Sequence, residues 1–182
     1  MSDNLDHIKD PLQQARKIFY MIDKNGNEKV NLWEIKQSIQ FDDQKFSKEI
    51  LRKVMTRFDQ NQDGVLEKDE FCRFYVWLYK RVQEFKSYDT DGNHLMDFDE
   101  FYECVNQANL HYHMDRGLVK MMVNKTLNSQ PGNKVGLNLE SFINLRTTLF
   151  NLQNEFKKLS GGKNSAHLHY DEYLLHVAKA LM

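Results

Sequence analysis

The sequence predicts an all-α protein made of repeated helix–loop–helix units. Only 2 Pro and 8 Gly occur among 182 residues, too few turn residues for an all-β sandwich. Hydrophobic residues make up 41% of the chain and aromatic residues 12%, which is enough for a core and excludes global disorder. Apolar residues recur at helical spacing on both sides of short acidic segments. The acidic segments are therefore the candidate functional loops.

Composition excludes several other classes of protein. The formal net charge is −1, whereas a nucleic-acid binder is far more basic. No run of 18 uncharged apolar residues occurs, so no transmembrane segment is predicted. No signal peptide is readable, and Cys72 and Cys104 lack metal-type spacing, so we expect a cytoplasmic protein with two buried thiols. No catalytic constellation is present, so we do not expect an enzyme.

Acidic residues are concentrated in two segments. Residues 59–70 and 89–100 together hold ten acidic residues and one basic residue. Carboxylates at this density repel one another unless a cation lies among them. A solvated acidic loop is the alternative, and the order of the residues decides between the two.

Loop two, residues 59–70, fits the calcium-loop pattern D-x-[DN]-x-[DN]-G-x5-E at every position. Calcium takes six to eight oxygen ligands, and this spacing supplies side chains at positions 1, 3 and 5, a main-chain carbonyl at position 7 and two carboxylate oxygens at position 12. Gly64 at position 6 supplies the positive φ of the turn. The predicted ligands are Asp59, Asn61, Asp63, Val65 and Glu70.

Loop three, residues 89–100, fits the same pattern with one departure. His94 stands at position 6 in place of Gly, and His tolerates the left-handed region better than most residues. We expect the four carboxylates at side-chain positions of this loop to outweigh the strain. The predicted ligands are Asp89, Asp91, Asn93, Leu95 and Glu100.

Loop one, residues 23–34, is a weaker copy with only two charged ligands. Glu28 at position 6 must adopt a positive φ, at a cost of about 1–2 kcal/mol for an ordinary residue. Because calcium affinity follows ligand charge, a weak site and an empty scaffold both stay open. The candidate ligands are Asp23, Asn25, Asn27, Lys29 and Glu34.

The flanking segments predict how the loops are connected and paired. Apolar residues at helical spacing run up to each loop and resume after it. No turn residue occurs from Phe71 to Tyr88, so one continuous helix leaves loop two and enters loop three. Position-8 residues are expected to join paired loops by short β-bridges, Val30 with Leu66 and Met96 with Leu137.

The C-terminal part repeats this frame without the ligands. A long helix is predicted from about Leu139 to Leu159, followed by a fifth loop-like stretch, residues 160–172, and a last helix. The fourth and fifth loops lack carboxylates at positions 1, 3 and 5 and should hold no metal. We expect calcium-binding repeats over residues 1–108 and degenerate ones over residues 109–182, or one continuous domain.

With these loops the chain resembles the EF-hand calcium-binding superfamily. Five repeats, with one helix shared by the second and third and another by the fourth and fifth, are similar to the penta-EF family, and the stretch from Trp77 to Asp89 fits the shared helix of that family. The resemblance implies an EF-hand array that binds Ca²⁺ and dimerises through its fifth hand. Here that hand comprises Leu168, Tyr173, Leu174 and Val177.

Two classes of function follow. The first is a cytosolic calcium sensor or buffer that binds a protein target. The second is a regulatory or structural subunit of a larger complex, for example a protease, that uses the EF-hand scaffold as an interaction surface. Met114, Met121 and Met122 fit either a target groove or core packing. His111, His113, His167 and His169 fit solvated side chains better than zinc ligands.

Overall fold

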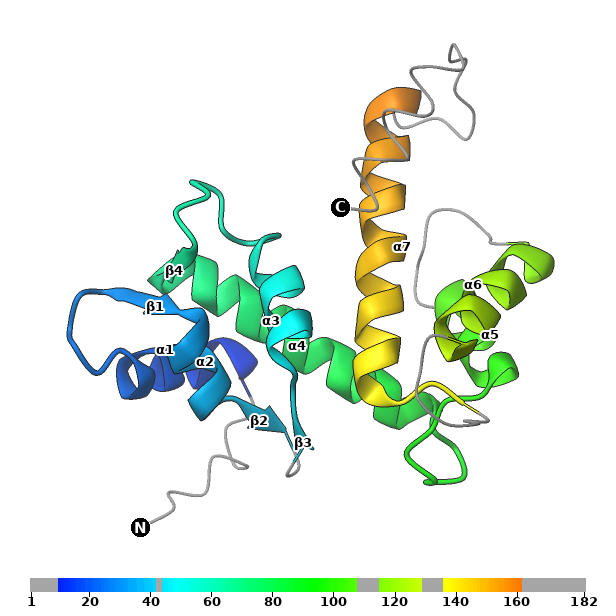
Figure 1. The fold of residues 1–182 in the computed structure, drawn as a ribbon, viewed down its shortest axis with the longest axis horizontal. Helices are drawn as coiled ribbons and strands as arrows, with labels where there is room; N and C mark the ends of the chain where they lie inside the picture. The colour runs from blue at the N-terminus through cyan, green and yellow to red at the C-terminus, as the bar shows by residue number, and fades with distance from the viewer. Residues whose placement is uncertain (1–9, 42–43, 108–114, 129–135, 162–182) are drawn as a thin grey trace. The chain divides into compact units, whose positions relative to one another are not determined.

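The computed structural model describes residues 10–41, 44–107, 115–128 and 136–161 (Figure 1). Its contacts divide the chain into two compact units, Met1–Ser87 and Tyr88–Met182. The described residues form helices joined by loops with very short strands, which confirms the all-α helix–loop–helix class. No helix among them is long and apolar enough to cross a bilayer.

The first unit holds two helix–loop–helix repeats. The first repeat contains α1 (Pro11–Ile22), β1 (Lys29–Asn31) and α2 (Leu32–Ser38), and the second contains α3 (Lys48–Met55), β4 (Val65–Glu67) and α4 (Lys68–Tyr88). β1 and β4 pair antiparallel, with Val30 opposite Leu66 (Figure 1). Both side chains are fully buried, so the predicted bridge between these position-8 residues is confirmed.

Local capping signals explain where these helices begin. Asp10 accepts a hydrogen bond from the Leu12 N–H at 2.9 Å, and Pro11 occupies the first turn of α1. Asn31 and Glu34 form a reciprocal capping box at the start of α2. Ser47 accepts a bond from the Ile50 N–H at the start of α3.

Two details of the first unit differ from the sequence analysis. α3 ends at Met55, and the Phe58 N–H bonds the Met55 carbonyl at 2.8 Å in a tighter turn, whereas the apolar pattern predicted a helix up to Phe58. A two-residue ribbon, β2 (Gln40–Phe41) paired with β3 (Gln44–Lys45), joins the two repeats and was not predicted.

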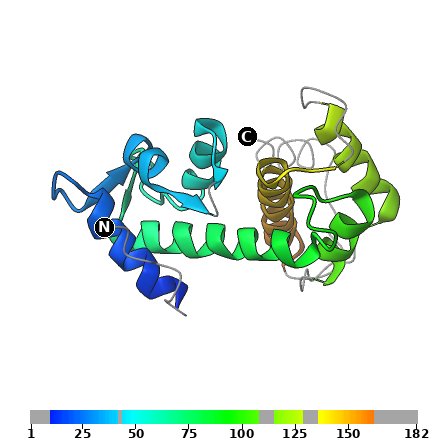
Figure 2. The same cartoon turned by 90° about the horizontal axis from the view of Figure 1, so that it is seen from below.

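α4 is one uninterrupted helix of 21 residues, as predicted, and is drawn in green in Figure 2. Its buried face carries Phe71, Phe74 and Leu78, each with no exposed surface. The Phe71 ring lies 5.7 Å from Phe19 of α1, centroid to centroid. Burying side chains of this size stabilises a fold by about 1.5–3 kcal/mol each. α4 thereby anchors loop two to the core of the first unit.

The second unit contains α5 (Phe98–Gln107), α6 (Arg116–Asn128) and α7 (Leu139–Ser160). Met96 and Leu137 form an isolated antiparallel bridge with two main-chain hydrogen bonds of 2.8 Å, which confirms the second predicted pairing. α7 begins at the N-cap Asn138 and ends at Gly161, whose φ is 59°. The predicted long helix is thus confirmed.

The division between the two compact units falls after Ser87. The Met96–Leu137 bridge gives a physical reason, because it ties loop three to the fourth repeat. The assignment of calcium-binding and degenerate domains remains a prediction. Residues 162–172 of the predicted fifth loop and the predicted last helix, including Leu168, Tyr173, Leu174 and Val177, lie outside the described residues, as do the four histidines of the two His-x-His pairs.

Candidate metal centres

The three loops share one backbone conformation. Residues at positions 4 and 6 have positive φ in each: Gly26 (67°) and Glu28 (59°), Gln62 (58°) and Gly64 (81°), Gly92 (67°) and His94 (61°). The positive φ expected at position 6 is confirmed in all three, including the two loops where the residue is not Gly. The turn at position 4 was not predicted, although a Gly at that position in loops one and three signalled it.

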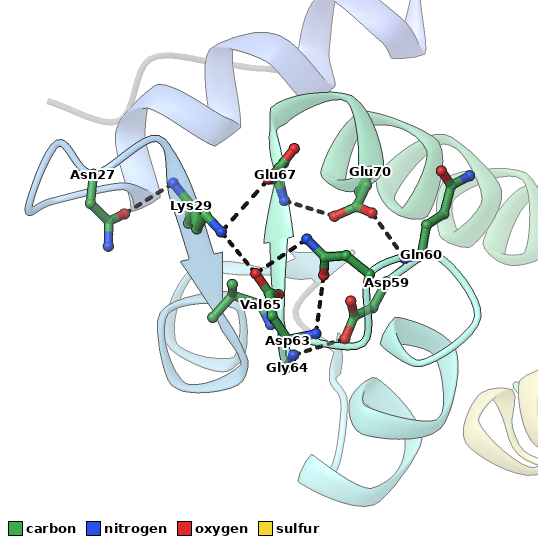
Figure 3. Close-up of polar contacts among 10 residues, drawn as sticks. Asn27, Lys29, Asp59, Gln60, Asp63, Gly64, Val65, Glu67 and Glu70 are labelled. Carbon is green, nitrogen blue, oxygen red and sulfur yellow. Dashed lines mark hydrogen bonds and ion pairs between the residues drawn. The ribbon is translucent and has the colours of Figure 1, made fainter.

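In loop two, the side chains at positions 1, 3 and 5 fold inward on main-chain N–H groups (Figure 3). Asp59 Oδ2 accepts from the Gly64 N–H at 2.9 Å, and Asn61 Oδ1 accepts from the Asp63 N–H at 3.0 Å. Asp63 Oδ1 accepts from the Val65 N–H at 3.1 Å. These bonds gather the predicted side-chain ligands on the inner side of one tight turn.

The position-12 glutamate closes loop two by bonding both ends of it. Glu70 Oε1 accepts from the Gln60 N–H at 2.9 Å and Oε2 accepts from the Glu67 N–H at 3.0 Å (Figure 3). The Glu70 side chain is buried although it belongs to an acidic loop. Its two oxygens are therefore held at the place where the pattern requires a bidentate ligand.

Loop three repeats this network. Glu100 accepts from the Thr90 and Asp97 N–H groups, both at 3.0 Å. The three inward bonds, donor first, are His94 N–H to Asp89 Oδ2 (3.1 Å), Asn93 N–H to Asp91 Oδ1 (3.0 Å) and Leu95 N–H to Asn93 Oδ1 (2.7 Å). Loop three, with His at position 6, thus has the same hydrogen-bond pattern as loop two, with Gly at that position.

Loop one differs at its position-12 residue. Glu34 Oε2 accepts from the Asn31 N–H at 2.9 Å, the counterpart of the Glu67 and Asp97 bonds. At position 2, however, the Lys24 N–H donates to the Ile22 carbonyl at 2.8 Å instead of to the glutamate. Glu34 therefore does not bond position 2 as Glu70 and Glu100 do.

The hydrogen bonds of the position-1 aspartates also distinguish loop one from loops two and three. Asp59 Oδ1 and Asp89 Oδ1 are buried and have no hydrogen-bond partner among the described residues. In loop one both oxygens of Asp23 accept main-chain bonds, from Asn27 at 3.2 Å and from Glu28 at 3.0 Å. A buried carboxylate oxygen without a partner costs about 1–3 kcal/mol, and a bound cation removes that cost. Loops two and three thus fit a cation at position 1.

A group of three His, Cys, Asp or Glu side chains placed for metal binding is not found among the described residues. The ligand set of a calcium loop is broader, because it includes amide and main-chain oxygens. Asn61 and the Val65 carbonyl in loop two, and Asn93 and the Leu95 carbonyl in loop three, belong to that broader set. Carboxylates alone do not define either site.

A lysine from loop one reaches the ligands of loop two. Lys29 Nζ lies 2.8 Å from Asp63 Oδ2 and 3.6 Å from Glu67 Oε1 (Figure 3). The hydrogen bond to Asp63 raises the pKa of Lys29, and the hydrogen bond from Lys29 lowers the pKa of Asp63. The loop pattern indicates only the main-chain carbonyl of Lys29 as a ligand and carries no signal for this side-chain contact.

An aromatic cluster adjoins the entry to loop two. The Trp77 ring of α4 lies 6.2 Å from the ring of Phe58, which directly precedes Asp59. The Arg57 guanidinium lies 4.8 Å from the Trp77 centroid and that of Arg81 lies 5.7 Å away. Burial, with a smaller contribution from Arg81, lowers the pKa of Arg57 to about 10. Trp77 is thus placed to sense a change at loop two.

The remaining candidates fall on the core or on the surface. Cys72 and Cys104 are buried, as expected, and form no disulfide with each other. Burial is the largest cause of the raised pKa of Cys72. Met121 is exposed and Met122 is half-buried on α6, so neither is a fully buried core residue.

The first two repeats match a known family. Residues 12–76 fit the model of the EF-hand domain pair. The 16 kDa calcium-binding protein of Schistosoma mansoni is 35% identical over 65 residues, 36% of this chain and 46% of that protein. The probable calcium-binding protein CML27 of Arabidopsis thaliana is 25% identical over 101 residues, 54% of this chain and 59% of that protein. The chain thus spans about half the length of these curated relatives.

A solved structure extends the likeness over nearly the whole chain. The homolog of programmed cell death 6 protein from Leishmania major Friedlin superposes with a TM-score of 0.73 at 16% identity, covering 94% of this chain and 96% of that one. At this identity the likeness shows the fold alone. The fold likeness reaches beyond the two matched repeats.

Proposed function

Because this chain belongs to the EF-hand calcium-binding superfamily and has Ca²⁺ as its cofactor, we propose that loops two and three are its two calcium sites and that it is a calcium sensor. The ligands of loop two are Asp59, Asn61, Asp63, the Val65 carbonyl and Glu70. The ligands of loop three are Asp89, Asp91, Asn93, the Leu95 carbonyl and Glu100. Loop one, with Asp23, Asn25, Asn27, the Lys29 carbonyl and Glu34, binds more weakly.

One observation carries this proposal. In loops two and three, Asp59 and Asp89 each keep one buried oxygen for which the described part of the chain supplies no hydrogen-bond partner, while Glu70 and Glu100 bond both ends of their loops. In the calcium-loop pattern, the residues at positions 1 and 12 are both ligands of the cation. In loop one, both oxygens of Asp23 already accept main-chain bonds.

Calcium titration of the full chain by calorimetry tests the stoichiometry. We expect two ions to bind tightly and any third ion to bind at higher calcium concentration. Magnesium serves as the control, because it keeps several waters and fits an all-protein cage poorly. Three equivalent sites, or none, would contradict the proposal.

Tryptophan emission distinguishes a sensor from a buffer. Trp33 is 59% exposed, so it must first be replaced by Phe to leave Trp77 as the reporter. A sensor reorients its helices on binding calcium, whereas a buffer barely moves them. We expect the Trp77 emission to shift in the Trp33→Phe variant, since Phe58 and Arg57 connect that ring to loop two. An unchanged spectrum with calcium bound would indicate a buffer.

We also propose a protein target, a cytoplasmic setting and a dimer through the fifth hand. Exposed Tyr20, Met21 and Trp33 support a protein-binding surface, and two buried cysteines that are not joined in a disulfide suit a reducing compartment. The dimer rests on the penta-EF resemblance. Sedimentation at tens of micromolar should show a dimer for the full chain and a monomer after truncation at Phe156. A monomeric full chain contradicts a homodimer, and aggregation of the chain alone favours the subunit role.

A further inference from the structure

We propose that Lys29 of loop one is a built-in counter-cation of loop two that sets its calcium affinity. This inference rests on the proposed function, because it requires loop two to bind calcium. It assigns to the Lys29 side chain a role separate from that of the Lys29 main-chain carbonyl in loop one.

The contact is built by the strand pairing. Lys29 stands opposite Glu67 in the β1–β4 ladder, at position 7 of loop one and position 9 of loop two. From there its Nζ reaches Asp63 Oδ2 at 2.8 Å and Glu67 Oε1 at 3.6 Å (Figure 3). One ammonium group thus contacts two acidic residues of the neighbouring loop, and one of them, Asp63, is a predicted ligand.

The ammonium group lies on one oxygen of that ligand while the loop's own backbone holds the other. Asp63 Oδ1 accepts from the Val65 N–H, and Oδ2 accepts from Lys29 and from Asn61 Nδ2, at 2.8 and 3.3 Å. Calcium binding places a second cation at a carboxylate that is already paired. Binding must therefore displace Lys29 or bear its repulsion, and either effect lowers the affinity of loop two.

The pair is only partly exposed. The Lys29 and Asp63 side chains retain 39% and 33% of their accessible surface, so solvent screens the interaction in part. For a partly screened charge we expect a change in calcium affinity of about three- to tenfold when it is removed.

The test is made in the full chain carrying Glu100→Gln. This substitution weakens calcium binding by loop three, so that the tight binding measured comes from loop two. Calorimetry should show that Lys29→Met binds calcium about three- to tenfold more tightly than its parent, because the main-chain carbonyl stays and only the ammonium group is lost. Lys29→Arg keeps the charge and should stay within about twofold of the parent.

Lys24→Met is the matched control. Lys24 is exposed at position 2 of the same loop, so this variant removes the same charge and leaves the Lys29–Asp63 pair intact. The proposal predicts a clearly smaller effect for Lys24→Met than for Lys29→Met. Equal effects of the two variants, or weaker binding by Lys29→Met, would overturn it. Loss of all binding in Glu100→Gln alone would refute the calcium site in loop two, a failure distinct from that of Lys29.

Discussion

Loop one and loops two and three have the same backbone but offer different groups to a cation. All three have positive φ at positions 4 and 6, and in all three the position-12 glutamate accepts the N–H of position 9. They differ at the first and last ligand positions, the position-1 aspartate and the position-12 glutamate. Within the described residues, the position-1 aspartate keeps a buried oxygen without a hydrogen-bond partner in loops two and three, where the glutamate also bonds position 2, and neither feature occurs in loop one.

The difference shows that the backbone conformation of a loop and the availability of its oxygens for a cation are determined separately. The local hydrogen bonds of Asp and Asn side chains to the main chain build the turn whether or not the loop carries charge. A loop of low charge can thus keep its shape as a pairing partner for its neighbour. Loop one does this through the Val30–Leu66 bridge.

The most direct way to break the comparison is to remove the closing glutamates. Glu70→Gln together with Glu100→Gln should eliminate both tight ions, since each variant loses a charged bidentate ligand. The loss per site should be at least the roughly 100-fold that removal of a supporting partner of a metal ligand can cause. Calorimetry measures it. Glu34→Gln is the control and should leave two tight ions. A double variant that still binds two tight ions would show that the ligand assignment is wrong.

Spacing alone predicted the parts of the fold that depend on local sequence. The positive φ at Gly64, Glu28 and His94 followed from the loop pattern, and the two position-8 bridges followed from the order of the repeats. The continuous helix over Phe71–Tyr88 followed from the absence of turn residues. Each of these signals depends on neighbouring residues or on the order of the repeats along the chain.

Features that depend on tertiary contact were not predictable in this way. Lys29 and Asp63 are 34 residues apart, and their contact depends on the strand register and on the reach of a long side chain. Position 1 is Asp in all three loops, yet among the described residues only Asp59 and Asp89 keep a buried oxygen without a hydrogen-bond partner, whereas both oxygens of Asp23 accept bonds. The β2–β3 ribbon is too short for alternation to indicate a strand.

A second prediction disturbs loop three without changing a ligand. Gly136 is buried, and an added Cβ would lie 3.0 Å from both Leu95 Cβ and the Met96 carbonyl oxygen. Gly136→Ala should strain the Met96–Leu137 bridge and destabilise the protein by about 1–2 kcal/mol.

Thermal unfolding without calcium measures this loss of stability. Gly26→Ala in loop one is the comparison, since an added Cβ there meets no atom within 4 Å and only its φ of 67° opposes the change. If Gly136→Ala unfolds at the wild-type temperature, the bridge tolerates the methyl group.

A third prediction tests whether charge alone separates loop one from the others. Asn25→Asp with Asn27→Asp keeps the oxygens that accept the Asn27 and Lys29 N–H groups, each at 3.0 Å, and raises the number of carboxylates. Calcium affinity of loop one should rise about tenfold or more. A third ion in calorimetry would show that charge was lacking. If no third ion binds, the hydrogen bonds of Asp23 and Glu34 rather than charge limit calcium binding by loop one.

The prediction with the smallest expected effect tests the strain of the left-handed backbone conformation at position 6, which all three loops share. His94 has a φ of 61°, and its side chain is 79% exposed, so His94→Gly removes left-handed strain with little loss of packing. Because Gly also gains freedom in the unfolded chain, we expect a net stabilisation of only about 0.5–1 kcal/mol.

Gly64→Ala is the opposite substitution at the same loop position. An added Cβ there meets no atom within 4 Å, so its φ of 81° is the main cost, and we expect a loss of about 1–2 kcal/mol. Chemical unfolding without calcium measures both. If His94→Gly destabilises while Gly64→Ala does not, position 6 is not the strained point of the loop, and the common turn must be held by the inward bonds of Asp59 and Asp89 instead.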